Sequence, residues 1–270
     1  NSQEKLTIAV ALNDDVPFNV DFNIAPKPYY WEGPLPFDTM NFTPFAYQEE
    51  GIRWMVGHAL HAVTDGIGRF EGALLADDMG LGKTFMTLAG LNAWQNIMHQ
   101  REGTQYVAKP VLVIAPVVLL ENWKEEIDKV FAVSPFKDTV VLQANGDLKR
   151  FRTDEVRDGV TKHALKIGKT FGYGRLDLPG RIVLTNYETL RLYPISLYSV
   201  DWGMVVFDEA QAIKNPNALS SRAAKGLKAD FRLAVTGTPV ENQLIDFWNI
   251  FDTISPGMLD TCQQFRKNYI

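Results

Sequence analysis

Two short stretches of the chain combine residue types and spacings that suit chemistry on phosphate groups. The first reads Gly-Leu-Gly-Lys-Thr from Gly80 to Thr84, between a short apolar run and a predicted helix. Glycines there let the backbone turn so that successive N–H groups face a phosphate, and the helix N-terminus adds partial positive charge. Lys83 would reach the β- and γ-phosphates, and the Thr84 hydroxyl would bind Mg²⁺. The stretch predicts a phosphate-binding loop.

The second stretch is Asp208-Glu209-Ala210-Gln211, which directly follows the apolar residues 205–207. A carboxylate in this position can hold Mg²⁺, and a neighbouring carboxylate can polarise an attacking water as general base. We therefore assign the metal to Asp208 and the base to Glu209. An Asp-Glu pair at a strand end is as often only solvated surface, so the phosphate loop earlier in the chain is what favours catalysis.

The phosphate loop departs from the common pattern in one position. The pattern Gly-x-x-x-x-Gly-Lys-[Ser/Thr] begins with glycine, whereas this chain has Asp77, followed by a second acid, Asp78. A chance Gly-Lys-Thr at a helix start is the plain alternative. The two acids argue against an ordinary kinase-like loop and indicate a particular subgroup of motor proteins.

The elements that must position these motifs alternate along the chain. Strands are expected at residues 6–12, 73–76, 111–115, 139–142, 181–185, 203–207 and 231–236, and helices at 48–62, 84–94, 119–130 and 187–192. Short, nearly all-apolar strands separated by helices predict an α/β fold, with a mostly parallel sheet covered by helices on both faces. Residues 1–41, rich in proline and aromatic side chains, are predicted to be a lead-in segment or the end of an upstream domain.

The composition is that of a soluble globular protein and excludes several classes. Of 270 residues, 46% are hydrophobic, and no apolar run approaches the ~20 residues of a membrane span. The first residues do not combine a basic stretch with an apolar core, so export is not expected. The single cysteine, Cys262, excludes an internal disulfide, and with only four histidines a structural zinc site is not expected. The net charge of −5 would not by itself suggest a nucleic-acid partner.

Taken in order, the motifs from Phe42 to Ile270 resemble the Swi/Snf-type double-stranded-DNA translocases of helicase superfamily two. Residues 76–84 are similar to the family's D-E-M-G-L-G-K-T loop, with Asp78 in place of Glu, and residues 208–211 match its D-E-A-[HQ] box. Residues 233–243 are similar to its L-T-G-T-P-x-x-N coupling motif. Residues 45–55 resemble its adenine-side motif, and residues 113–126 and 186–190 resemble two of its DNA-tracking motifs.

The resemblance implies that residues 42–270 form the first RecA-like lobe of an ATP- and Mg²⁺-dependent motor on duplex DNA. It assigns nucleotide binding to Gln48, Asp78, Met79, Gly80, Leu81, Gly82, Lys83 and Thr84, and catalysis to Lys83, Asp208 and Glu209. It assigns the metal to Thr84 and Asp208, coupling to Gln211, Thr236, Gly237 and Thr238, and nucleic-acid contacts to Pro116, Asn186, Tyr187 and Asn242. The family's second RecA-like lobe, which carries an arginine finger, is absent from this chain, so the lobe alone is expected to be nearly inactive.

The expected partners are double-stranded DNA, the second lobe and DNA-bound proteins, which the motor would remodel or displace; no membrane partner is expected. The Asp-Glu-Ala-Gln box favours a prokaryotic source, with the protein on cytoplasmic DNA in DNA transactions or defence, or in the nucleus of a eukaryote. Two alternatives remain open. One is a strand-separating helicase on RNA or single-stranded DNA, and the other is a nucleotide-gated interaction module.

Two further features have competing interpretations. Trp123 could pack on a duplex or on another lobe, but a tryptophan on an amphipathic helix is more often core, so we leave it outside the predicted site. Residues 149–175 are rich in lysine and arginine with interleaved aromatic side chains. They could neutralise a DNA backbone or form a flexible, solvated insertion, and we expect residues 160–179 to be removable without loss of the fold.

Overall fold

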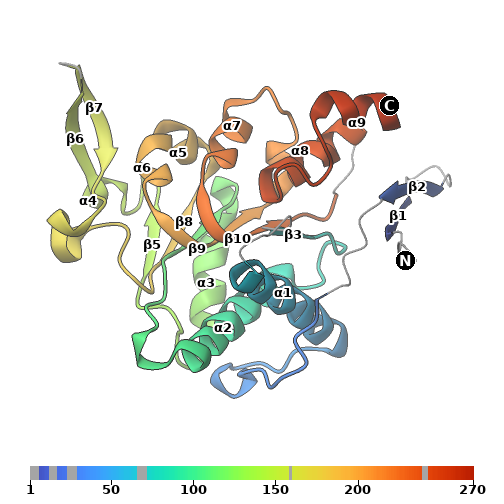
Figure 1. Ribbon diagram of the computed structural model, residues 1–270. Helices are drawn as coiled ribbons and strands as arrows, with labels where there is room; N and C mark the ends of the chain where they lie inside the picture. Colours follow the sequence, from blue (N-terminus) through green and yellow to red (C-terminus); the bar gives the residue numbers. More distant parts are fainter. Residues whose placement is uncertain (1–5, 12–16, 23–28, 66–71, 158–159, 239–242) are drawn as a thin grey trace.

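The computed structural model describes residues 6–11, 17–22, 29–65, 72–157, 160–238 and 243–270. Six strands form a parallel sheet in the order β3-β10-β9-β4-β8-β5 (Figure 1). These strands are β3 (Gly72–Leu75), β4 (Val111–Ile114), β5 (Thr139–Leu142), β8 (Ile182–Thr185), β9 (Asp201–Asp208) and β10 (Lys228–Val235). Every residue of β4 and β8 is buried, which explains their continuous apolar sequence. The predicted mostly parallel sheet is confirmed.

Helices cover both faces of this sheet. Figure 1 shows α1 (Ala46–Asp65), α2 (Lys83–Glu102) and α3 (Leu120–Val130) below it. On the other side lie α5 (Tyr187–Leu192), α6 (Pro194–Tyr198), α7 (Leu219–Lys225) and α8 (Leu244–Ile254), with α9 (Cys262–Tyr269) against α8. The helix predicted at 84–94 is longer than expected, because its buried face continues to Met98. No helix in the described part of the chain is long and apolar enough to span a membrane.

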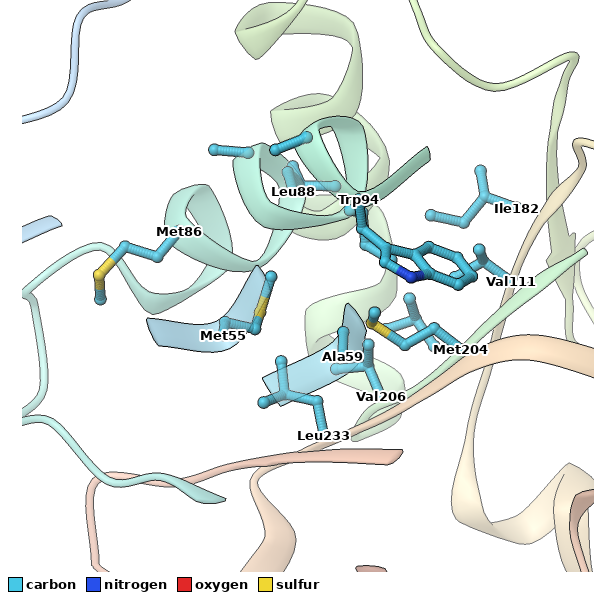
Figure 2. Packing of buried hydrophobic residues seen from close by; sticks show 14 of the residues in the cluster. Met55, Ala59, Met86, Leu88, Trp94, Val111, Ile182, Met204, Val206 and Leu233 are labelled. Carbon is cyan, nitrogen blue, oxygen red and sulfur yellow. The ribbon is translucent and has the colours of Figure 1, made fainter. Parts of the chain in front are cut away.

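The alternation of side chains along the strands divides the core into two layers. In β4, Val111 and Val113 belong to the layer between the sheet and helices α1 and α2, whereas Leu112 and Ile114 belong to the layer on the opposite face of the sheet. Figure 2 shows the first layer, where Met55 of α1 and Trp94 of α2 lie among apolar side chains of the sheet. A side chain at Gly90 would meet Met55, so this glycine allows α1 and α2 to pack closely.

Part of the predicted lead-in packs on the lobe. The backbone N–H of Trp31 donates to the carbonyl of Arg53 on α1, and that of Asn41 donates to the carbonyl of Val130 on α3. Met40 is buried in the core layer between the sheet and helices α1 and α2. Residues 29–41 therefore contact α1 and α3, and the domain boundary at 41 stays a prediction. Upstream, the strand expected at 6–12 is present as β1 (Leu6–Ala11), paired antiparallel with β2 (Pro17–Phe22).

Part of the basic segment 149–175, predicted to neutralise a DNA backbone or to form a flexible, solvated insertion, has regular secondary structure. It contains α4 (Leu148–Phe151) and an antiparallel pair, β6 (Arg152–Arg157) and β7 (Val160–Leu165), which projects beyond β5 in Figure 1. Leu165 and Leu176 are buried in the layer under α5 to α7. Removal of residues 160–179 would take these two side chains from the core, which argues against the expectation that this deletion spares the fold.

Candidate active site

The phosphate loop lies between the end of β3 and the first turn of α2. Gly80 and Gly82 have φ angles of 85° and 80°, a left-handed conformation that favours glycine. At Gly82 a side chain would also meet the amide nitrogen of Gln48 at 2.6 Å. Gly80 and Gly82 let the loop turn into α2, whose first amide groups have no partner within the helix. The predicted strand–loop–helix context is confirmed.

The ammonium group of Lys83 is folded back onto this loop. It donates hydrogen bonds of 2.8 Å to the backbone carbonyls of Asp77 and Asp78. A phosphate placed in the loop would compete for the same ammonium group, and a charged acceptor makes the stronger bond. Met79 is largely exposed at the tip of the loop.

The acidic pair ends β9 at the same edge of the sheet. The Asp208 side chain is buried, and its Oδ1 accepts a 2.9 Å bond from the backbone N–H of Glu209. Its Oδ2 accepts a 2.7 Å bond from the indole N–H of Trp123. Burial raises the pKa of Asp208 above its ordinary value, and the bond from Trp123 opposes that rise. Trp123 is in the core, as expected, but it also contacts the site, which its sequence position did not reveal.

Glu209 has a conformation that is rare for a residue other than glycine. Its φ and ψ angles are 47° and 55°, in the left-handed region. Such a conformation costs on the order of 1–3 kcal/mol and is concentrated at functional sites. The Glu209 carboxylate accepts a 2.7 Å bond from the amide of Gln211. The strained turn thus holds Glu209, the predicted general base, beside Gln211, which is predicted to couple ATP hydrolysis to movement.

The predicted coupling residues form a continuous chain of hydrogen bonds. The Thr236 hydroxyl donates to Oε1 of Gln211 at 2.7 Å, and the backbone N–H of Thr238 donates to the Thr236 hydroxyl at 3.1 Å. Gly237 lies against the phosphate loop, since a side chain there would come within 2.8 Å of Met79. Residues from β9, β10 and the phosphate loop therefore meet at one edge of the sheet.

Gln48 of α1 holds the phosphate loop by a hydrogen bond. Its amide nitrogen donates to the Leu81 carbonyl at 3.2 Å, and its oxygen accepts from the backbone N–H of Phe45 at 3.0 Å, which caps α1. Beside it lies a cavity of about 440 Å³ that three aromatic rings help to line. The lining residues are Tyr30, Tyr47, Glu50, Gly51, Trp54, Leu74, Leu75, Ala76, Asp77 and Leu81. The cavity is large and aromatic enough to accept a nucleobase.

Thr84 and Asp208 provide the chemistry that Mg²⁺ requires. Both carry oxygen donors, which this hard cation prefers, and Mg²⁺ ordinarily completes its shell with water and substrate phosphates. Burial raises the pKa of Asp208, and the positive charge of Lys83 opposes part of that rise. Within the described ranges, no group of three or more His, Cys, Asp or Glu side chains is arranged for a metal. The two residues fit a metal shared with a nucleotide.

The residues predicted to contact nucleic acid are arranged differently from one another. Pro116 follows the carboxyl end of β4 and leads into a turn with the exposed side chains Val117 and Val118. Asn186 is only 5% exposed and caps α5 by accepting from the N–H of Thr189. The Tyr187 hydroxyl donates to the backbone carbonyl of Asp208 at 2.7 Å. The side chains of Asn186 and Tyr187 thus both make hydrogen bonds within the lobe, and their contact with nucleic acid stays a prediction. Asn242 lies outside the described residues.

Comparison with known proteins identifies the family to which this site belongs. A family model described as the SNF2-related domain matches residues 47–270. The chain belongs to the SNF2-related family. Over 229 residues it is 38% identical to the Zorya protein ZorD of Escherichia coli O139:H28, covering 83% of this chain and 19% of that protein. It is 28% identical over 223 residues to the RAD54-like DNA repair and recombination protein of Drosophila ananassae, covering 83% and 25%.

A solved SNF2 structure has the same architecture. The Sulfolobus solfataricus SWI2/SNF2 ATPase core in complex with dsDNA matches with a TM-score of 0.59 and 30% sequence identity. The match covers 90% of this chain and 40% of that one. The resemblance to a Swi/Snf-type first lobe with a RecA-like fold is confirmed. The chain spans only a minor part of the length of these SNF2 relatives.

Proposed function

We propose that this chain is the first RecA-like lobe of an ATP-driven translocase that moves on double-stranded DNA and remodels or displaces bound proteins. The observation that carries the proposal is the chain of hydrogen bonds from Glu209 through Gln211 to Thr236. It joins Glu209, the predicted base, to the end of β10 beside the phosphate loop. An ATPase that responds to the γ-phosphate requires such a connection. The solved relative is described as a complex with dsDNA, which supports a duplex as the track.

In this proposal the nucleotide binds along the carboxyl edge of the sheet. The base enters the cavity beside Tyr47, and the amides from Gly80 to Thr84 bind the phosphates. Lys83 exchanges the carbonyls of Asp77 and Asp78 for phosphate oxygens. Bound Mg²⁺ would draw charge from the phosphate oxygens, and Thr84 and Asp208 would hold it.

Glu209 then accepts a proton from the water that attacks the γ-phosphate. When Glu209 changes charge or partner, Gln211 must adjust, because its amide donates to Glu209 and accepts from Thr236. We further propose that a second RecA-like lobe supplies an arginine, a contribution worth ~10³-fold or more, so the lobe alone is nearly inactive. The protein would act on DNA, in the cytoplasm of a prokaryote or the nucleus of a eukaryote.

ATP turnover by the full-length protein tests the proposal. It is measured without nucleic acid, with duplex DNA, with single-stranded DNA and with RNA, and Glu209→Gln serves as the blank. We expect strong stimulation by duplex and displacement of a triplex-forming strand without separation of the duplex. Stimulation by single strands or RNA alone, with strand separation, would instead favour a helicase. Absence of stimulation by all three would favour a nucleotide-gated interaction module.

A further inference from the structure

The Asp208 carboxylate is held by the protein at both of its oxygens. Oδ1 accepts from the backbone N–H of Glu209 at 2.9 Å, and Oδ2 accepts from the Trp123 indole at 2.7 Å. The backbone of Asp208 is fixed as well, because its carbonyl accepts from the Tyr187 hydroxyl and its strand pairs with β10. The orientation of the carboxylate about its side-chain bonds is therefore decided by two donors, of which Trp123 is the only side chain found among the described residues.

Trp123 is itself rigidly placed. It lies on α3, its side chain is 1% exposed, and it packs in the core layer with Ile127 and Val130 of the same helix. Helix α3 begins directly after the turn Val117–Leu119. A buried ring that cannot change rotamer without opening the core can hold a carboxylate in one orientation.

The bond also leaves room for a metal. An ionised carboxylate has about four lone-pair sites, and the two protein donors occupy one on each oxygen. A metal ion, or a water bound to it, can use those that remain. Hydrogen bonds from outer-shell groups to a ligating carboxylate orient it, and their loss typically costs ~10–100-fold in metal affinity or activity.

We propose that Trp123 is a positioning residue that orients the Asp208 carboxylate for the magnesium ion of the ATPase site. This inference rests on the proposed function, since it takes Asp208 as a ligand of the nucleotide-bound metal. The competing account is that Trp123 only fills space in the core. The two accounts differ in what happens when an aromatic ring stays at this position and the indole N–H is removed.

The test compares Trp123→Phe with Trp202→Phe in the full-length protein. Trp202 is also fully buried, and its indole N–H donates to the backbone carbonyl of Leu197 at 3.1 Å, on the opposite face of the sheet. Each variant therefore loses one buried indole donor and a similar volume. The affinity for a fluorescent ATP analogue is measured in EDTA and over a Mg²⁺ titration, and thermal unfolding is recorded for both variants.

We expect Trp123→Phe to raise the half-saturating Mg²⁺ concentration about tenfold or more, with unchanged affinity for the analogue in EDTA. Trp202→Phe should leave the Mg²⁺ dependence as in the wild type. An unchanged Mg²⁺ dependence in Trp123→Phe, or an equal shift in both variants, would overturn the proposal. Because the readout is nucleotide binding, it decides the role of Trp123 even where DNA fails to stimulate turnover and the translocase proposal fails.

Discussion

The side chains of Gln211 and Thr236 are joined by a hydrogen bond of 2.7 Å, although Gln211 follows β9 and Thr236 follows β10. We expect Thr236→Val, which removes the hydroxyl and keeps the shape, to lower the DNA-stimulated turnover about tenfold, the effect of ~1.4 kcal/mol. Steady-state ATPase assays measure this. The control is Thr253→Val, a buried threonine whose hydroxyl donates to Asn249 within α8. Equal losses in both variants would indicate a general packing effect.

Lys83 is expected to be needed for nucleotide affinity but not for the fold. Its present partners, the carbonyls of Asp77 and Asp78, can bind water when the ammonium group is removed. Lys83→Ala should weaken binding of a fluorescent ATP analogue by about 10- to 100-fold, as for the loss of a charged hydrogen bond worth ~1.5–3 kcal/mol. The melting temperature should not change. The control is Lys129→Ala, at an exposed lysine of α3, which should keep the wild-type affinity. Wild-type affinity in Lys83→Ala would contradict the role assigned to Lys83.

Glu209→Gln should separate binding from hydrolysis. The amide keeps the size of the side chain but cannot accept a proton, and loss of a general base typically costs ~10²–10⁴-fold in rate. We expect ATP affinity close to that of the wild type and turnover reduced by at least about 100-fold. Equilibrium binding and single-turnover hydrolysis in the full-length protein measure the two quantities. Full activity of this variant would refute the role of Glu209.

The buried side chain of Arg181 should make Asp138 important for stability. Arg181 is 1% exposed and forms two 2.7 Å hydrogen bonds with the Asp138 carboxylate. Asp138→Ala leaves the buried guanidinium without its counter-ion, so we expect a loss of about 3 kcal/mol in the free energy of unfolding. The exposed pair Arg191–Glu188 provides the control, because Glu188→Ala should cost less than ~1 kcal/mol. Urea unfolding measures both, and similar losses would contradict the argument.

His58 predicts a dependence of stability on mild acid. Burial, aided by the nearby His61, lowers the pKa of His58 from 6.5 to about 4. Its ring lies against Trp54 and Tyr29. At His58 the unfolded chain binds a proton at higher pH than the folded chain does. Its contribution is therefore constant above pH 6.5, and it lowers stability as the pH drops from 6.5 to about 4.

His58→Phe keeps an aromatic ring at this position and removes the titrating group. We expect its stability to decline less between pH 6.5 and 4 than that of the wild type, as measured by thermal unfolding at a series of pH values. The same decline in both proteins would show that His58 is not responsible.

The sequence alone determined the fold class and the chemical motifs, because both depend on local pattern. Apolar runs the length of a strand predicted the buried parallel sheet, and β5 at Thr139–Leu142 has the predicted bounds. The glycines before Lys83 predicted a tight turn of the backbone, and Gly80 and Gly82 have the left-handed conformation that few other residues adopt. The acidic pair followed from its place at the end of an apolar run.

Only the tertiary structure decided which side chains support those motifs. Trp123 reaches Asp208 across 85 positions in the sequence, and nothing in its own helical pattern separates this role from simple packing. Asn186 and Tyr187 follow a strand as a ligand-contacting turn would, and only the fold shows that their side chains also hold α5 and the backbone carbonyl of Asp208. Such contacts join residues that are distant in the chain, so they are fixed by strand order and helix packing, which local periodicity does not encode.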